Sequence, residues 1–173
     1  MPPGSHHRRS GAPVGADQMS RLLTQIYLFE EIFAALQEAF PDAEFVVEDK
    51  PVDDTFLKLA PEKVRPAAEL LIEKFDIYHL STITGDDAGD GVRLLYHFWS
   101  SYGITLDTLL PYANLRIPTL TDLIPGAAFY EREIQEMLGV TFEGLATPGP
   151  MFLPDDWDGS FPLRRDSDKR EAK

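Results

Sequence analysis

The sequence predicts an α+β fold: a largely antiparallel sheet covered by two helices, followed by a short helix and an extended irregular C-terminal arm. Three observations predict it. Apolar residues recur at helical spacing near the amino terminus and again after Pro61, β-rich runs lie on both sides of a Gly/Asp loop at residues 85–90, and no periodic pattern follows Gly144. Runs of strands between helices favour helices packed on one face of an antiparallel sheet.

The chain is expected to open with an amphipathic helix over residues 21–40, which ends before Pro41. Two short strands follow, over residues 44–48 and 55–60, on either side of a polar turn. The apolar residues that define this helix are three or four positions apart: Leu22, Ile26, Phe29, Phe33, Leu36 and Phe40.

A second helix comes next, and its start is open between Pro61 and Pro66, because proline is well tolerated in a first helical turn. Residues 76–84 and 91–101 predict a hairpin, and residues 104–112 supply one more strand. These three runs together are expected to form an antiparallel meander.

A third helix is predicted over residues 127–138, with Gly139 as its left-handed C-cap. Its apolar face is formed by Tyr130, Ile134, Met137 and Leu138. The chain is thereby divided into four parts: a disordered arm or non-native remnant over residues 1–18, an α+β domain over 19–117, the segment of the third helix over 118–144, and an extended partner-binding arm over 145–173.

Composition limits the function classes. The net charge is −13, which repels nucleic-acid phosphates and anionic membrane surfaces. The chain contains no cysteine, so by itself it forms no disulfide, thiolate nucleophile or conventional iron–sulfur cluster. No run of about 18 apolar residues predicts a membrane span. A soluble protein partner fits this composition best.

The acidic residues of the third helix are the first candidates for catalysis. Glu131 and Glu133 point about 200° apart on a helix, so they cannot share one site. Arg132 and Glu136 are neighbours at i, i+4 and can pair. A structural or docking role is therefore favoured, with a small free-standing enzyme that uses Glu131 and Glu136 as the alternative. No catalytic and no cofactor-binding residue is predicted.

Two histidines are candidate metal ligands. His79 and His97 lie on neighbouring strands of the predicted hairpin, and one register places them directly opposite each other. A shift by one residue separates them onto opposite faces. Because no metal-ligand spacing accompanies them, the sequence predicts no metal site.

The segment after Gly144 is irregular but carries apolar side chains, among them Phe152 and Trp157, that need a surface to pack against. A second protein is the simplest such surface. For Arg164 and Arg165 the sequence leaves two roles open. They are either solvated residues at the end of the chain or residues that form ion pairs with that partner.

The ordered run "IPTLTDLIPGAAFYEREIQEMLGVTFEG" and the closing "FPLRRD" resemble the signature of the 30-kDa subunit family of respiratory complex I, over residues 76–166. Within the chain, "FLPDDW" is similar to the corresponding subunits of membrane-bound energy-converting hydrogenases and their sulfur-reducing relatives. Gly149-Pro150 stand where the family has two basic residues, so the role of that pair is not carried over. The matching residues are Pro118, Thr121, Pro125, Ala128, Tyr130, Glu131, Arg132, Glu133, Met137, Gly139, Phe142, Gly144, Pro162, Leu163, Arg164 and Asp166.

The resemblance implies a cofactor-free subunit in the peripheral arm of a complex-I-like oxidoreductase, on the cytoplasmic face of the membrane. Such a complex couples electron transfer to ion translocation. The implied partners are a large catalytic subunit and a small iron–sulfur subunit, and the iron–sulfur clusters, with or without a nickel–iron centre, belong to them. A ferredoxin-linked hydrogenase-type complex is favoured, with an NADH-quinone oxidoreductase as the alternative and an acidic adaptor outside respiration as a third class.

Within that subunit, the sequence predicts two groups of positioning residues. Arg132 and Glu133 are expected to hold the third helix against adjoining segments. Phe152, Trp157 and Arg164 are expected to anchor the arm on the partner.

Overall fold

The computed structural model describes residues 30–48, 54–100, 103–146 and 149–165. The arm expected over residues 1–18, the first part of the predicted amino-terminal helix and Asp166 lie outside the described residues. Residues 30–39 are helical, in agreement with the carboxyl-terminal part of that helix, and the chain leaves the helix before Pro41.

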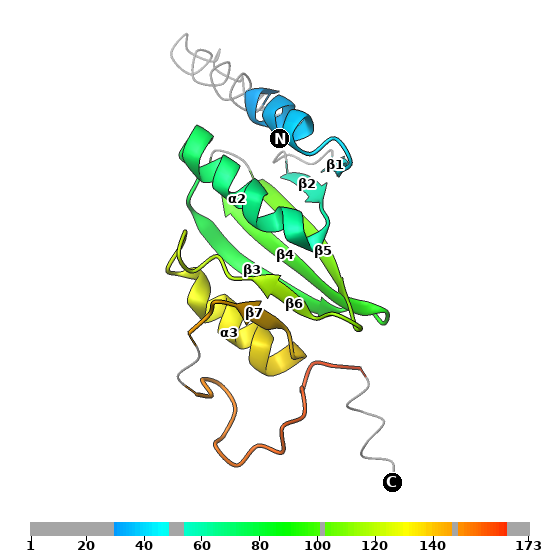
Figure 1. Cartoon of the computed structure of the whole chain (residues 1–173), viewed down its shortest axis with the longest axis vertical. Helices are drawn as coiled ribbons and strands as arrows, with labels where there is room; N and C mark the ends of the chain where they lie inside the picture. Colours follow the sequence, from blue (N-terminus) through cyan, green and yellow to red (C-terminus); the bar gives the residue numbers. More distant parts are fainter. Residues whose placement is uncertain (1–29, 49–53, 101–102, 147–148, 166–173) are drawn as a thin grey trace, which may run out of the picture.

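A five-stranded sheet forms the centre of the molecule, in the order β1-β2-β5-β4-β3 (Figure 1). Neighbouring strands are antiparallel except β2 and β5, which are parallel. The predicted α+β class and the meander of three consecutive strands are confirmed. The strands are β1 (Glu44–Glu48), β2 (Asp54–Lys58), β3 (Leu80–Asp87), β4 (Gly91–Trp99) and β5 (Gly103–Pro111).

The hairpin between β3 and β4 is tighter than the sequence predicts. Residues 85–90 are expected to be a loop, but β3 continues through Asp87, and the Ala88 N–H closes the turn on the Gly91 carbonyl at 2.9 Å. The Asp87 side chain points inward and accepts the Gly89 N–H at 3.0 Å. The strand therefore extends as far as its last buried residue.

Helix α2 (Pro61–Phe75) begins at the first of its two candidate prolines, and Pro66 lies inside it. The helix is capped by Asp76, whose left-handed backbone turns the chain so that the Ile77 N–H reaches the Leu71 carbonyl at 3.0 Å. Its buried face packs on the sheet through Val64, Ala67, Ala68 and Leu71.

Helix α3 (Ala127–Leu138) has the bounds that the sequence predicts. It connects two three-residue strands, β6 (Arg116–Pro118) and β7 (Thr141–Glu143), which pair in parallel. These strands are outside the sequence prediction, because three residues are too few for an alternating pattern.

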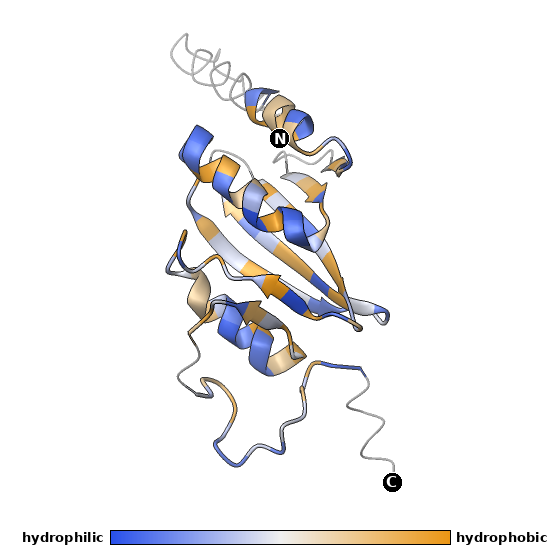
Figure 2. Cartoon of the chain, viewed as in Figure 1, coloured by the Kyte–Doolittle hydropathy of each residue, from blue (hydrophilic) through white to orange (hydrophobic). Residues whose placement is uncertain are grey.

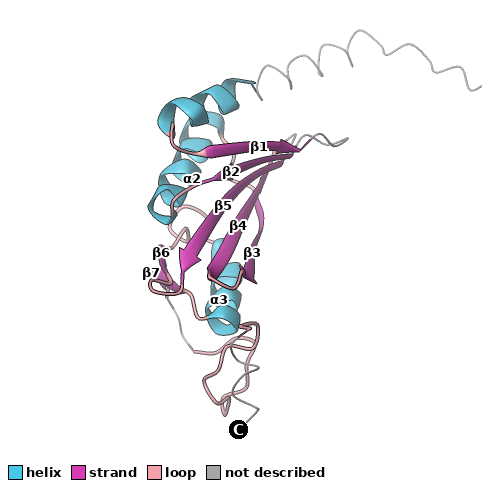
Figure 3. Cartoon of the chain, turned by 90° about the vertical axis from the view of Figure 1, so that its right-hand side faces the viewer, coloured by secondary structure: helices cyan, strands magenta, loops and turns pink. Residues whose placement is uncertain are grey.

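The helices leave one face of the sheet bare in the part of the chain that the structure describes. Tyr96, Leu94 and Leu106 on β4 and β5 are fully buried, and hydrophobic and hydrophilic residues alternate along the strands (Figure 2). Helix α3 reaches the same face at the edge strand, where a Cβ on Gly85 would lie 2.6 Å from Leu138. Figure 3 shows α2 on one side of the sheet. Trp99, at the end of the alternating burial pattern of β4, is exposed.

Candidate protein-docking site

Glu131, the first acidic residue of helix α3, which carries the family-like sequence signature, is fully buried. Its carboxylate accepts the Leu120 N–H at 2.7 Å and the Thr119 hydroxyl. Burial raises the pKa of Glu131, although these two hydrogen bonds oppose the rise. The residue fixes α3 to the segment that follows β6.

The same segment is held from its other side by Arg65, which belongs to no sequence motif. Its guanidinium donates to both oxygens of Asp122, at 2.7 and 2.6 Å, and to the Thr119 carbonyl at 2.9 Å. The contact joins residues 57 positions apart, so no local sequence pattern predicts it. Helices α2 and α3 are thereby tied to one turn.

Glu136 binds the C-terminal arm. Its carboxylate accepts backbone N–H groups from three consecutive residues, Met151, Phe152 at 2.8 Å and Leu153 at 3.1 Å. Burial alone would raise the pKa of Glu136, but the three N–H groups and the charge of Arg132 bring it below its usual value. An anion cradled by backbone amides is a strong attachment point.

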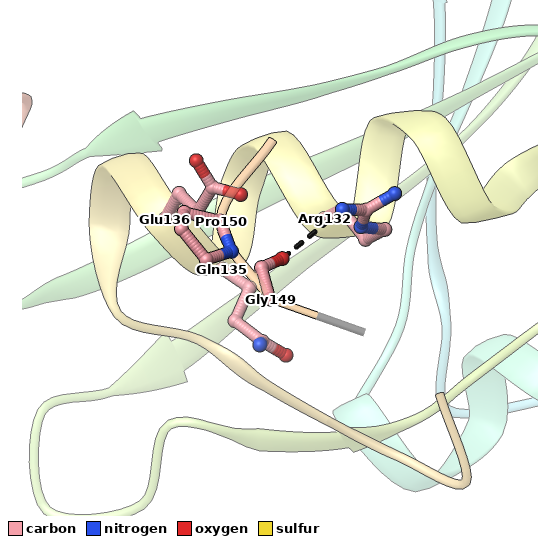
Figure 4. Close-up of a pocket in the computed structure, with 5 residues that line it drawn as sticks. All are labelled: Arg132, Gln135, Glu136, Gly149 and Pro150. Atoms are coloured by element: carbon pink, nitrogen blue, oxygen red, sulfur yellow. Dashed lines mark hydrogen bonds between the residues drawn. The ribbon is translucent and has the colours of Figure 1, made fainter. Parts of the chain in front are cut away.

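Arg132 contacts the arm one turn earlier, where its Nη2 donates to the Gly149 carbonyl at 3.1 Å (Figure 4). The expected side-by-side placement of Arg132 and Glu136 on the helix is present. Both side chains hydrogen-bond to the arm backbone, because carbonyl and N–H groups of residues 149–153 lie within their reach. Glu133 is exposed on another side of the helix.

The arm returns to the body of the protein near the end of α3. The Leu163 N–H donates to the Met137 carbonyl at 3.0 Å, and Arg164 Nη1 donates to the Leu138 carbonyl at 3.2 Å. The Arg164 guanidinium also lies 4.4 Å from the centre of the Tyr112 ring. With its side chain only 12% exposed, Arg164 makes its contacts within this chain.

Asp87 is the buried acid that receives this end of the arm. It accepts the Tyr112 hydroxyl and the Arg165 N–H, the latter at 2.8 Å, and lies 3.6 Å from Arg164 Nε. Burial opposes ionisation, but these hydrogen bonds and the Arg164 charge leave the pKa of Asp87 below its usual value.

Between the two attachments the arm makes an outward turn with exposed aromatic side chains. Trp157 Nε1 donates to the Ser160 carbonyl at 2.8 Å, and the Ser160 N–H donates to Asp158 at 2.8 Å. Phe152 is 52% exposed and Trp157 42%, and Leu163 beyond the turn is 58% exposed. Pro162 is half-buried. The backbone is therefore held in place while large apolar side chains face solvent.

The remaining signature residues serve the packing of α3. Tyr130 donates its hydroxyl to the Ser81 carbonyl at 2.8 Å, and Phe142 on β7 is buried. Gly144 has φ +93°, a backbone conformation that favours glycine. Pro125 is exposed in the turn before the helix, where its carbonyl accepts the Ala128 N–H.

His97 lies in strand β4, but the prediction that His79 lies on the neighbouring strand is wrong, because β3 begins at Leu80 and His79 is exposed just before it. His97 is opposite Thr82, since the register shifts between Leu80 and Thr82, and its two ring nitrogens lie 3.0 Å from the Thr105 hydroxyl and 3.2 Å from the Thr84 hydroxyl. Among the described residues, no group of three or more His, Cys, Asp or Glu side chains is arranged to hold a metal ion. No helix in that same part of the chain is long and apolar enough to cross a bilayer.

These features define a class. A small α+β domain with a fixed terminal arm that exposes several aromatic side chains is typical of a protein that packs against other proteins. The model of the family described as respiratory-chain NADH dehydrogenase, 30 Kd subunit, matches residues 57–173. The chain belongs to this family.

Proteins similar to this chain occur in more than one kind of complex. The membrane-bound hydrogenase subunit beta of Pyrococcus furiosus is 31% identical over 79% of this chain and 84% of that protein. An NADH-quinone oxidoreductase subunit of Roseiflexus castenholzii is 33% identical over 78% of this chain and 81% of that protein. Among solved structures, a chain of the archaeal membrane-bound sulfane sulfur reductase matches with a TM-score of 0.69 and 27% identity, over 83% of this chain and 90% of that chain.

Proposed function

We propose that this chain is a cofactor-free subunit of a complex-I-like oxidoreductase and that it holds neighbouring, cluster-bearing subunits in position. The observation that carries the proposal is the arm, whose backbone is fixed by Glu136 while Phe152 and Trp157 remain exposed. An apolar side chain on a fixed backbone is stabilised when a second protein covers it. We assign residues 145–173 to this partner-binding arm and residues 19–117 to the domain that carries it.

The partners in this proposal are a large catalytic subunit and a small iron–sulfur subunit on the cytoplasmic face of the membrane. Redox centres must be placed to within about an ångström for efficient reaction, so a subunit without its own cofactor still affects turnover through positioning. Iron–sulfur clusters, with or without a nickel–iron centre, then belong to the partners.

For the type of complex, we propose a ferredoxin-linked, ion-translocating hydrogenase. The "FLPDDW" segment and the similarity to the Pyrococcus furiosus hydrogenase subunit support this choice. The alternative is an NADH-quinone oxidoreductase, supported by the relative from Roseiflexus castenholzii. Mass spectrometry of the native complex separates them: a large subunit with paired C-x-x-C motifs identifies the hydrogenase type, and a large subunit without them identifies a quinone or sulfur reductase.

The docking role is tested by affinity purification of the complex through a tag on the large subunit. The double variant Phe152→Ala/Trp157→Ala is expected to co-purify in much reduced amount, whereas Tyr78→Ala, an exposed aromatic just before β3, is expected to co-purify normally. Normal yield of the double variant would contradict arm docking. If the isolated chain turned over a substrate by itself, the free-standing enzyme using Glu131 and Glu136 would replace this proposal.

A further inference from the structure

The arm and helix α3 border two hollows that share one residue, Gln135. The first, of about 320 Å³, is also lined by Arg132, Glu136 and Gly149-Pro150 (Figure 4). The second, of about 340 Å³, is lined by residues that include Val140, Leu145 and Phe161. Because Gln135 lines both, we treat them as one groove beside the arm.

The lining of this groove mixes apolar side chains with polar groups and carries little free charge. Val140 is buried, Leu145 is partly buried and Phe161 presents part of its ring to solvent. The two charged side chains in the first hollow already bond to the arm backbone, Arg132 to the Gly149 carbonyl and Glu136 to N–H groups. The groove therefore offers a ligand the apolar side chains of Leu145 and Phe161 beside polar groups such as the Gln135 amide.

The outer turn of the arm adds a negative rim. Asp155, Asp156 and Asp158 are exposed there, and no lysine or arginine occurs between residues 149 and 163. The whole chain carries a net charge of −13, which strengthens this field. A segment that enters the groove therefore gains from positive charge on both sides of an apolar side chain.

The groove is also built before any partner arrives. Its outer wall is held at one end by Glu136 and at the other by the Leu163–Met137 hydrogen bond, so docking does not have to order the arm. Such preorganisation lowers the entropic cost of binding.

We propose that this groove binds a segment of the adjoining subunit that carries an apolar side chain flanked by lysine or arginine. The proposal rests on the docking function above and adds which side of the arm is used and what chemistry it recognises. The acidic rim provides charge complementarity and speeds association with the basic segment. The apolar side chains of the groove hold the inserted side chain.

Photo-crosslinking in the assembled complex tests this directly. A benzophenone amino acid at position 135 is expected to crosslink to a peptide of another subunit that contains lysine or arginine beside an apolar residue. The same probe at Glu133, exposed on the same helix outside the groove, is expected to give no such product. A crosslink to a second copy of this chain, to a segment without basic residues, or equally from both positions would overturn the proposal.

Two variants provide an independent readout. Gln135→Trp fills the groove and is expected to lower incorporation into the complex at least tenfold, whereas Glu73→Trp, at an exposed position of helix α2, leaves it unchanged. The triple variant Asp155→Asn/Asp156→Asn/Asp158→Asn is expected to dissociate about tenfold faster at low salt and to match the wild type at high salt, where rim charges are screened. Unaltered melting temperatures of the isolated variants confirm that they fold.

The outcomes separate the two proposals. If the wild-type chain does not co-purify with any other subunit, the docking function itself fails. If the complex assembles but Gln135→Trp and the rim variant behave as the wild type, only the groove is overturned.

Discussion

The ring of Phe161 lies over Gly139, so close that a Cβ on the glycine would come within 2.6 Å of the ring. Gly139 caps helix α3 with φ +76°, and Phe161 belongs to the returning arm. The position thus requires glycine both for its backbone conformation and for space. The contact couples the end of the signature helix to the arm.

Replacing Gly139 by alanine is expected to destabilise the fold by about 2–3 kcal/mol, because the left-handed backbone costs about 1 kcal/mol and displacing the Phe161 ring costs a similar amount or more. Gly159 is the matched control, since it has φ +81° and nothing within 4 Å of its Cβ position. Gly159→Ala is expected to cost only about 1 kcal/mol in urea unfolding. Equal losses for both variants would show that the ring contact contributes nothing.

Removing the charge of Glu136 is expected to loosen the arm with little effect on global stability. In Glu136→Gln, the backbone N–H groups of residues 151–153 lose a charged acceptor, so their hydrogen exchange should accelerate about tenfold, corresponding to roughly 1.5 kcal/mol. Glu133→Gln, an exposed acid on the same helix, is the control and should leave exchange unchanged. Unchanged exchange at 151–153 would mean that Glu136 does not hold the arm.

Because Glu136 is ionisable, its contact with the arm should make the attachment of the arm depend on pH. The folded-state pKa of Glu136 lies below its usual value, so its stabilisation is present above the ordinary glutamate pKa of about 4.3 and is lost as the pH falls through the folded value. Protection of the arm amides in the wild type should decline in that acidic range, whereas Glu136→Gln should show no such decline. Parallel pH profiles would contradict this assignment.

The stability of the fold is expected to tolerate glutamine at position 131 but not leucine. Glutamine can accept the Leu120 N–H and donate to the Thr119 hydroxyl, so Glu131→Gln should stay within about 1 kcal/mol of the wild type, whereas Glu131→Leu leaves the Leu120 N–H without its acceptor and should cost about 2–4 kcal/mol. Chemical denaturation at neutral pH measures both. Similar losses in the two variants would refute this hydrogen-bonding role.

The pKa of Glu131 is shifted upward, whereas the pKa of Glu136 is shifted downward. Its contribution to stability is fully present below the ordinary glutamate pKa and is lost as the pH rises through the folded value. Wild-type stability should therefore fall relative to Glu131→Gln as the pH rises above about 4.3. A constant difference between the two proteins across that range would contradict the raised pKa.

The contact between Asp87 and Arg164 is expected to contribute more to the stability of the fold. Asp87→Asn is expected to cost about 3 kcal/mol, because it removes a negative charge beside the nearly buried Arg164 and weakens the bonds to Tyr112 and Arg165. Since the pKa of Asp87 is lowered, the wild-type advantage should shrink as the pH falls below about 4. Asp90→Asn, at an exposed site in the same hairpin, should be neutral. Thermal unfolding of both variants across pH checks this pair.

Local sequence patterns are sufficient for much of the fold. The spacing of Tyr130, Ile134 and Leu138 predicts helix α3, and Gly139 marks its end, because both signals depend on residues within one or two turns. The strand β1 and the hairpin of β3 and β4 follow from equally local patterns. The parallel strands β6 and β7 do not, since three residues contain no measurable period.

The sequence by itself determined the order of the main elements, the separation of Glu131 from Glu133 and the presence of an aperiodic arm rich in apolar side chains. Only the tertiary structure decided that Glu131 is the buried one, that Glu136 and Arg132 bind the arm, and that Arg164 turns back to Asp87. These contacts join residues from 11 positions apart, Leu120 and Glu131, to 77 positions apart, Asp87 and Arg164. Helical periodicity assigns side chains to faces, but what each face meets depends on the path of distant segments, which no local pattern specifies.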